Sequence, residues 1–390
     1  MKHMLPPGNR RHQFRGGFSL VELMIAITLG LLIMTGLTTI FVKNSQARAE
    51  LERSNRQIES GRYAMSLLTE DLRMAGFFAA FNPYDRIIIA NAPPLGPDAS
   101  VSPAVAGITD MATIDPCITS ALPANAPNNL QSTFFFHVQG YDNPTTMPSC
   151  VSDVRTGSDI LVIRRVSTCV AGPTLEAGCD AVASGAPYFQ SSNCYRPAEL
   201  AKNSGGAASA KDYQAHFALS ADAASLTMHA IDCTTTAEYR RYLTHIYFVA
   251  NNNVGSDGIP TLKRAELGAS GFTIVPLVEG IETIQFEYGV DTNDDGTIDV
   301  YTTDPGSYGS CTGATCVGYW LRTYAVKVNL LARNIERSPG HADSKTYTLG
   351  LKADGSANVF PATGTFGDAY KRHVYNATVR LDNPSGRRTP

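Results

Sequence analysis

An unbroken apolar run near the N-terminus is the first strong pattern in this chain. Residues 18–42 contain no Lys, Arg or Asp, and their one ionisable side chain is that of Glu22. At about 1.5 Å per residue a helix of this length spans about 37 Å, which is enough to cross a bilayer core of about 30 Å. The run therefore predicts a transmembrane helix over residues 18–42.

The pattern then becomes amphipathic without a break. Residues 43–78 contain no Pro, and opposite charges stand three or four positions apart, as at Glu59 and Arg62. Apolar residues recur at a seven-residue step: Leu51, Ile58, Met65 and Leu72. One apolar stripe on a charged helix is typical of a helix that lies on a globular core. We therefore expect the helix to continue over residues 43–80 and to pack on the chain's own domain, with a parallel coiled coil as the alternative.

Beyond residue 80 the pattern is that of loops and strands. Residues 81–158 are rich in Pro, Ala, Asn, Ser and Thr, which predicts a loop-rich connection with one strand at 132–138. Residues 159–390 contain runs that predict strands, separated by polar inserts. These runs are 160–166, 242–250, 272–278, 281–290, 319–331 and 374–381. An antiparallel β-rich domain over 159–390, packed on one long N-terminal helix, gives an α+β fold.

Charge indicates how the apolar segment is oriented and processed. Basic residues before it place the N-terminus in the cytoplasm and the larger part of the chain outside: Lys2, Arg10, Arg11 and Arg15. A signal peptide carries its cleavage site after the apolar core. Here Gly16 and Gly17 come before the core, so a cut at the end of a 1–17 leader leaves the hydrophobic helix on the mature protein. A plain signal anchor is the alternative.

Glu22 needs a partner if it is to stay in a membrane segment. An acid inside such a segment costs roughly 2.5–3.5 kcal/mol on insertion scales. A buried carboxylate is tolerated where an opposite charge or hydrogen bonds satisfy it. Glu22 is therefore a candidate functional residue.

The segment from Gly17 to Glu22, with the sequence Gly-Phe-Ser-Leu-Val-Glu, resembles the processing motif of type IV prepilins and type II secretion pseudopilins. The resemblance implies that a prepilin peptidase cuts between Gly17 and Phe18 and that the new terminal Phe18 is N-methylated. It also implies that Glu22 pairs with the terminal amine of a neighbouring subunit and sets the axial register as helices bundle.

Three further segments are similar to those of PilW-type minor pilins. They are the run from Val278 to Gly289 with the Asp/Asn/Gly loop after it, the end of the predicted helix at 62–64 and 72–77, and the segment from Arg372 to Leu381. The resemblance implies a pilin-like α+β fold and a minor pilin that primes type IV pilus assembly at or near the tip. A minor pseudopilin of a type II secretion system and a tip-displayed adhesin, with its site in the loops over 82–158, are the alternatives.

The same resemblance implies partners and a location. The expected partners are other minor and major pilins, the prepilin peptidase, an inner-membrane assembly platform and inner-membrane lipid, with a tip adhesin as a further candidate. The expected location is the bacterial inner membrane, with one pass, a cytoplasmic N-terminus and a periplasmic C-terminal domain, and then the pilus.

The cysteines indicate an oxidising compartment. All eight lie beyond the apolar run, which favours disulfides in a periplasmic domain. Eight cysteines allow 105 pairings, so the spacing alone does not choose among them. The best local candidates are Cys311 with Cys316 and Cys169 with Cys179, and the absence of a Cys-x-x-Cys pair argues against zinc.

One loop has the spacing of a calcium site. Asp291, Asn293, Asp295, Thr297 and Asp299 occupy alternate positions, and Gly296 stands at the sixth place. However, Thr302 occupies the twelfth place, where a bidentate Glu is expected. The alternative is a plain Asp/Asn/Gly hairpin turn.

The sequence gives no support for an enzyme or a nucleic-acid-binding protein. The eight His are scattered, and no Walker loop, Gly-x-Ser-x-Gly elbow or His-Glu-x-x-His pair is present. The net charge is −3, and no basic block follows the leader. We therefore predict a structural protein without intrinsic catalysis, and with calcium as its one candidate cofactor.

Overall fold

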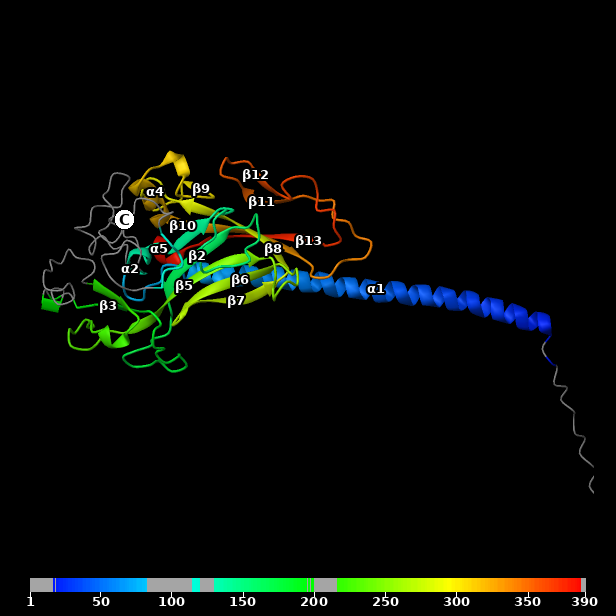
Figure 1. Cartoon of the computed structure of the whole chain (residues 1–390), viewed down its shortest axis with the longest axis horizontal. Coiled ribbons are helices and arrows are strands. Elements are labelled where there is room, and N and C mark those ends of the chain that lie inside the picture. Colours follow the sequence, from blue (N-terminus) through cyan, green and yellow to red (C-terminus); the bar gives the residue numbers. More distant parts are fainter. Residues whose placement is uncertain are drawn as a thin grey trace, which may run out of the picture. The chain divides into compact units, whose positions relative to one another are not determined.

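The computed structural model describes residue 17 and residues 19–82, 114–119, 130–194, 196, 198–199 and 216–386. The chain divides into two compact units, residues 1–53 and 54–390. Residues 1–16 of the predicted leader, Phe18, and much of the predicted 81–158 connection lie outside the described residues. The predicted α+β fold, with a long N-terminal helix and an antiparallel sheet domain, is confirmed (Figure 1).

The first unit contains the N-terminal part of α1 (Leu20–Arg73), a helix of 54 residues. Its side chains from Leu20 to Arg48 are exposed, and by length and composition α1 is a candidate membrane span. Thr side chains within it donate their hydroxyl hydrogens at 2.7–3.0 Å to backbone carbonyls three or four positions earlier: Thr28, Thr35, Thr38 and Thr39. These bonds satisfy hydroxyl groups that lipid cannot solvate.

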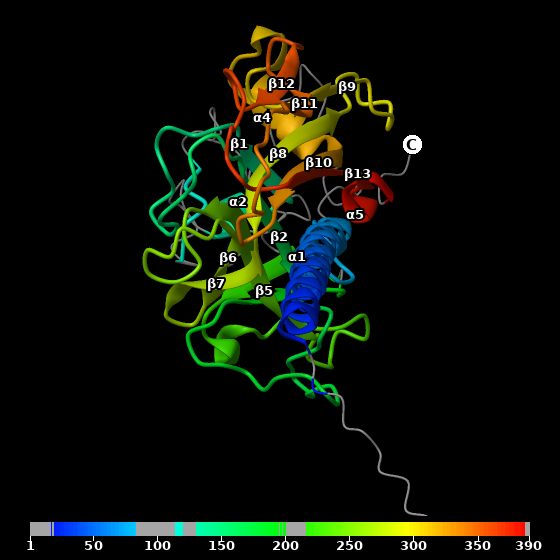
Figure 2. The ribbon, with the colours of Figure 1, turned by 90° about the vertical axis from the view of Figure 1, so that its right-hand side faces the viewer.

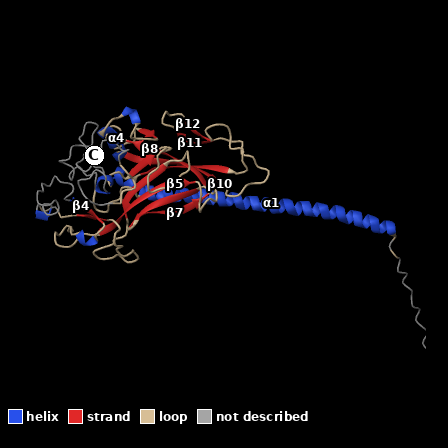
Figure 3. Ribbon diagram, in the orientation of Figure 1, coloured by secondary structure: helices blue, strands red, loops and turns tan. Residues whose placement is uncertain are grey.

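The second unit contains the sheets (Figure 3). The largest has seven strands: β1 (Val138–Tyr141), β2 (Ile160–Val166), β3 (Tyr188–Ser191), β4 (Phe217–Ser220), β5 (Tyr239–Ala250), β6 (Thr261–Gly268) and β7 (Gly271–Glu279). The central strand β5 pairs with β2, β3 and β6. A second sheet has the order β13 (Arg372–Arg380), β10 (Thr323–Arg333), β8 (Ile281–Val290) and β9 (Val300–Thr302). All pairings between the described strands are antiparallel.

Short elements complete the second unit. The hairpin of β11 (Tyr347–Leu351) and β12 (Ala357–Phe360) contacts β8 and β10 (Figure 2). The described short helices are α2 (Leu130–Thr133), η3 (Ala223–Ser225), η4 (Tyr308–Ser310), α4 (Ala314–Leu321) and α5 (Asp382–Gly386).

Two predicted strands differ from the structure in detail. Only the ends of the 132–138 run lie in α2 and β1, and the residues between them form a turn in which the Phe134 and Phe136 side chains are buried in the core. The 319–331 run begins inside α4, and β10 begins only at Thr323.

The C-terminal part of α1 packs on the domain, as predicted, but with a different set of residues. The buried positions are Gln57, Gly61, Ala64, Leu68, Asp71 and Leu72. Leu51 is 64% exposed and Ile58 is 36% exposed, so the predicted seven-residue stripe is wrong at these two positions. The buried positions 57, 64 and 71 also recur every seven residues, but each lies one position before the predicted stripe, and one position is a rotation of about 100° around the helix.

Two contacts fix α1 on the second sheet at close range. The Gln57 side-chain amide donates to the carbonyls of Ala332 and Lys371, both at 2.9 Å. Gly61 faces the ring of Tyr375 on β13, and a Cβ atom there would lie 2.2 Å from Cε2 of that ring. The absence of a side chain at position 61 therefore allows this approach. The helix ends at Arg73, before the predicted residue 80, and Gly76 follows with a φ of +71°.

Four disulfides tie the loops to the strands. They join Cys117 to Cys150, Cys169 to Cys179, Cys194 to Cys233, and Cys311 to Cys316. The two local pairs favoured from the spacing are thus both present. The predicted disulfide-braced loops are confirmed, and every cysteine in the chain is paired.

A buried arginine links the C-terminal segments. The Arg372 guanidinium donates to Glu282 on β8 and to Asp343 and Asp368 in the segments that flank the β11–β12 hairpin. The ring of Phe366 lies 3.5 Å from its central carbon. These contacts anchor the long connection between β10 and β13 to the second sheet.

Candidate functional site

The N-terminal end of α1 is organised by a short hydrogen-bonded motif. Ser19 donates its backbone N–H to Oε2 of Glu22 at 3.1 Å, and its hydroxyl accepts from the N–H of Val21 at 3.3 Å. Ser at the N-cap with Glu three residues later is a capping box, which satisfies backbone donors that have no helical partner. The backbone N–H of Ser19 is thus a local partner of Glu22 that was not predicted from the sequence.

Capping leaves part of the Glu22 carboxylate available. Oε2 accepts from Ser19, while Oε1 has no hydrogen bond in the described part of the chain. A carboxylate has about four lone-pair sites, so one intramolecular bond does not saturate it. Gly17 is exposed next to this motif, whereas Phe18 lies outside the described residues. Processing at Gly17 and register setting by Glu22 therefore stay predictions.

A buried carboxylate lies at the other end of α1, within the second unit. Asp71 is 5% exposed and accepts from three side chains on two strands of the larger sheet. Arg165 Nε on β2 lies 2.7 Å from its Oδ1, while His245 Nδ1 and the Tyr247 hydroxyl on β5 lie 2.6 and 2.8 Å from its Oδ2. Because an ionised carboxylate only accepts hydrogen bonds, Nδ1 of His245 carries a proton in this arrangement.

The environment keeps Asp71 ionised. Burial alone pushes its pKa upward, but the hydrogen bond and charge of His245, the charge of Arg165 and the hydrogen bond of Tyr247 hold that pKa well below the usual value of 3.8. Asp71 therefore joins α1 to β2 and β5 through an ion pair and hydrogen bonds. The sequence signal for it is an acid on the buried face of a helix, combined with His-x-Tyr on one face of a strand.

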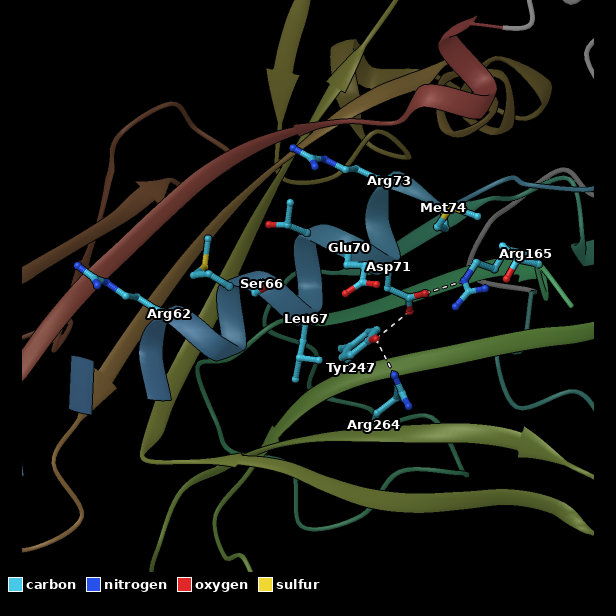
Figure 4. A pocket seen from close by; sticks show the side chains of 13 residues that line it. Arg62, Ser66, Leu67, Glu70, Asp71, Arg73, Met74, Arg165, Tyr247 and Arg264 are labelled. Atoms are coloured by element: carbon cyan, nitrogen blue, oxygen red, sulfur yellow. Dashed lines mark hydrogen bonds and ion pairs between the residues drawn. The ribbon is translucent and has the colours of Figure 1, made fainter. Parts of the chain in front are cut away.

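A hollow of about 870 Å³ opens beside Asp71 (Figure 4). Its lining comes from α1, from β2 and the residues after it, and from β5 and β6: Arg62, Met65, Ser66, Leu67, Thr69, Glu70, Asp71, Arg73, Met74, Arg165, Thr168, Tyr247 and Arg264. Arg264 donates to the Tyr247 hydroxyl at 3.2 Å and through Nε to Glu266 at 2.7 Å. The wall of the hollow is thus a connected network of charged side chains and a phenol.

The predicted calcium loop is closed by its own hydrogen bonds. The Asp291 carboxylate is fully buried and accepts backbone N–H groups of Asn293, Asp294 and Gly296 at 2.6–3.2 Å. Asp299 accepts from the backbone and hydroxyl of Thr292, and Asp295 accepts from the backbone and hydroxyl of Thr297. Asn293 donates to Asp295 at 3.2 Å.

These bonds form a turn between β8 and β9. Among the residues that the structure describes, no group of three or more His, Cys, Asp or Glu side chains has a metal-binding arrangement. Thr302, at the twelfth place, lies on β9 and is paired with Tyr288. The donor set therefore lacks the bidentate carboxylate that calcium loops use, and calcium binding here stays a prediction.

Two family models match the chain, one toward each end. Residues 13–38 match the prokaryotic N-terminal methylation motif, and residues 246–383 match the type IV pilus-assembly protein W. Comparison with curated proteins and with solved structures gives no match. The first segment contains Gly17 and Glu22, and the second begins within β5, includes the calcium-like loop and ends within α5. In these two segments the chain is similar to type IV pilin-like proteins of the PilW type.

Proposed function

We propose that the chain is a minor pilin that primes assembly of a type IV pilus and is located at or near the pilus tip. The observation that supports this most is the pairing of a methylation motif on an exposed apolar helix with a PilW-type domain at the other end of the chain. The first feature is what a subunit needs to enter a helical bundle. The second associates the domain with pilus assembly.

The proposed mechanism begins with processing. Cleavage after Gly17 by a prepilin peptidase removes the basic leader and creates a cationic amine on Phe18. The apolar segment of α1 then stays in the inner membrane, and the larger part of the chain lies in the periplasm, where the four disulfides form.

Glu22 supplies the register in this mechanism. Its Oε1, which accepts no hydrogen bond from the described residues, accepts one from the terminal ammonium group of a neighbouring subunit when the helices come together. An ion pair in low dielectric is favourable only when both charges lose water together and the geometry is good. A helix shifted by one turn leaves the carboxylate without this partner, so one axial register is favoured.

The test uses deletion of the gene and three complementing variants. We expect that deletion abolishes or strongly reduces surface pili, that Gly17→Ala blocks processing, and that Glu22→Ala is processed but incorporated poorly. Ser19→Ala removes the capping hydroxyl and serves as the matched control, because a purely capping role for Glu22 predicts similar defects in both. Normal piliation of the deletion strain would contradict the proposal, and loss of protein secretion instead would indicate a pseudopilin.

A further inference from the structure

The hollow beside α1 has an excess of positive charge on an acidic protein. Its lining contains four arginines and two acids, and Glu266, the ion-pair partner of Arg264, is a third acid, so the cluster has a formal charge of 4 − 3 = +1: Arg62, Arg73, Arg165, Arg264, Glu70, Asp71 and Glu266. The whole chain has a net charge of −3. A positive hollow on such a protein attracts an anionic group by charge complementarity.

The two inner arginines are already fixed in place. Arg165 is held by Asp71 through Nε and by the carbonyl of Val166 through Nη1, at 2.7 and 3.3 Å. Arg264 is held by Glu266 and by the Tyr247 hydroxyl. Nη2 of Arg165 has no hydrogen bond among the described residues. Guanidinium groups ordered in advance lose little conformational entropy when they bind an anion.

The two outer arginines have no ion-pair partner within the described part of the chain. Arg62 and Arg73 are exposed and stand eleven positions apart on α1, which is about 16 Å along the helix axis. Figure 4 shows both extending from one side of α1, whereas Asp71 extends from the other side toward Tyr247 and Arg165. The exposed Glu70 lies near Arg73, so a partner with uniform negative charge would be repelled there.

We propose that this hollow is the docking site for carboxylate side chains of a neighbouring pilin-like subunit, placed about three helical turns apart to match Arg62 and Arg73. The inference rests on the proposed function, because a priming complex brings neighbouring subunits along α1. Arginine presents a planar fork that matches a carboxylate in two parallel hydrogen bonds. The outer arginines guide the approach, and the inner pair provides the partly buried contact.

The test reverses the two outer charges in the full-length chain. We expect Arg62→Glu combined with Arg73→Glu to reduce the number of pili per cell by about tenfold or more, because like charges facing each other cost several kcal/mol. Processing, abundance and Tm should stay as in the wild type, since both side chains are exposed. The matched control is Lys345→Glu with Lys352→Glu, an equal charge change at two exposed residues outside the hollow, and it should leave piliation unchanged.

Three outcomes of these measurements would overturn the docking site. The first is normal piliation of the reversed variant in a strain whose deletion abolishes pili, which leaves the proposed function intact. The second is an equal defect in the Lys345→Glu, Lys352→Glu control. The third is inorganic phosphate that raises the Tm of the wild type but not of the reversed variant, together with normal piliation, which would assign the hollow to a small anion. Normal piliation in the deletion strain would instead contradict the proposed function itself.

A suppressor selection identifies the partner. Starting from the reversed variant, mutations that restore piliation should change Asp or Glu to Lys or Arg in another pilin-like subunit. Suppressors confined to this chain would overturn the proposal.

Discussion

At the scale of single residues, the most consequential feature is the placement of charges where the chain would be expected to be apolar. Asp71 lies on the buried face of α1, and Arg164 and Arg372 are almost fully buried in strands. Arg164 donates to the carbonyl of Phe136 and to Gln139 at 3.0 and 2.7 Å, so its burial is compensated by hydrogen bonds. Such groups fix the geometry of the domain, because each has one arrangement that satisfies it.

Replacement of Asp71 tests directly how much its contacts with the strands stabilise the domain. We expect Asp71→Ala to lower the free energy of unfolding by about 3–5 kcal/mol, because it leaves Arg165 and His245 without their shared acceptor in a buried place. The neighbouring Glu70→Ala is the matched control and should change stability by less than about 0.5 kcal/mol, since Glu70 is exposed. Urea unfolding of the purified full-length protein measures both. Equal effects of the two variants would contradict the role of Asp71.

His137 gives a prediction for pH. Burial lowers the pKa of this fully buried histidine from 6.5 to about 4, and its Nε2 lies 2.8 Å from the carbonyl of Thr323. Because the folded protein binds the proton less readily than the unfolded chain, His137 lowers the free energy of unfolding as pH falls from about 6.5, the pKa in the unfolded chain, to about 4. The slope from one such group is at most about 1.4 kcal/mol per pH unit.

Comparison with His137→Gln isolates this contribution. Gln retains a donor for the Thr323 carbonyl but does not titrate, so its unfolding free energy should depend less on pH between about 4 and 6.5. Burial raises the pKa of Asp159 to about 8, which acts in the opposite direction, but this effect is common to both proteins and cancels in the difference. Parallel curves for the two proteins would show that His137 does not act in this way.

At the scale of elements, the sequence predicts the regular parts well and the polar inserts poorly. The strands at 160–166 and 281–290 have the predicted bounds, because continuous apolar or alternating runs of this length favour strands, and nearly every position of both strands is buried. In contrast, β3 and β4 lie between the predicted strands at 160–166 and 242–250, where no strand was predicted, and β6 carries charged residues along its length. The pairing of these strands depends on residues that are distant in the sequence, so a local hydrophobic pattern does not predict it.

The candidate sites differ in the same way. Gly17 and Glu22 could be predicted because the motif is local, whereas the hollow beside Asp71 joins α1 to strands about 90 to 190 positions later. The seven-residue pattern of apolar residues on α1 predicted that Leu51 and Ile58 are buried, and it did not predict the burial of Asp71. A search for apolar residues alone does not find a buried helix face that contains a carboxylate.

The close approach of α1 to β13 gives a prediction for Gly61. Ala is usually the better helix residue by about 1 kcal/mol, but a Cβ at position 61 would overlap the Tyr375 ring. We therefore expect Gly61→Ala to destabilise the protein by about 1–3 kcal/mol through overpacking. Ser66→Ala, at an exposed position of the same helix, should be neutral or slightly stabilising. Thermal unfolding of both variants is the measurement, and a gain in stability for Gly61→Ala would rule out the tight contact.

The loop between β8 and β9 carries the calcium prediction. If it binds calcium, the Tm of the purified protein should rise with millimolar calcium but not magnesium, and Asp295→Asn should remove the rise because it deletes a charged oxygen ligand. Asp354→Asn, in an exposed turn of the β11–β12 hairpin, is the matched control. Equal Tm values with and without calcium would leave the loop as a hydrogen-bonded turn.

At the scale of the whole molecule, the four disulfides distribute their stabilisation unevenly. Cys117–Cys150 spans 33 positions, whereas Cys311–Cys316 spans 5. In the chain-entropy account the longer bridge restricts the unfolded chain more, by (3/2)RT ln(33/5), or about 1.7 kcal/mol. Replacing both cysteines of the longer bridge by Ser should therefore lower the free energy of unfolding more than the same change in the shorter bridge.

This difference connects the fold to the compartment in which we propose that the chain works. Neither the Cys117–Cys150 nor the Cys311–Cys316 bridge can form before the chain reaches an oxidising environment. In the proposed topology the loops that they close are therefore cross-linked only on the outer side of the membrane. Denaturant unfolding of the two double-Ser variants, in the presence and absence of a reductant, checks the ordering. Equal losses, or a larger loss for the Cys311–Cys316 variant, would mean that local packing rather than loop closure determines what each bridge contributes.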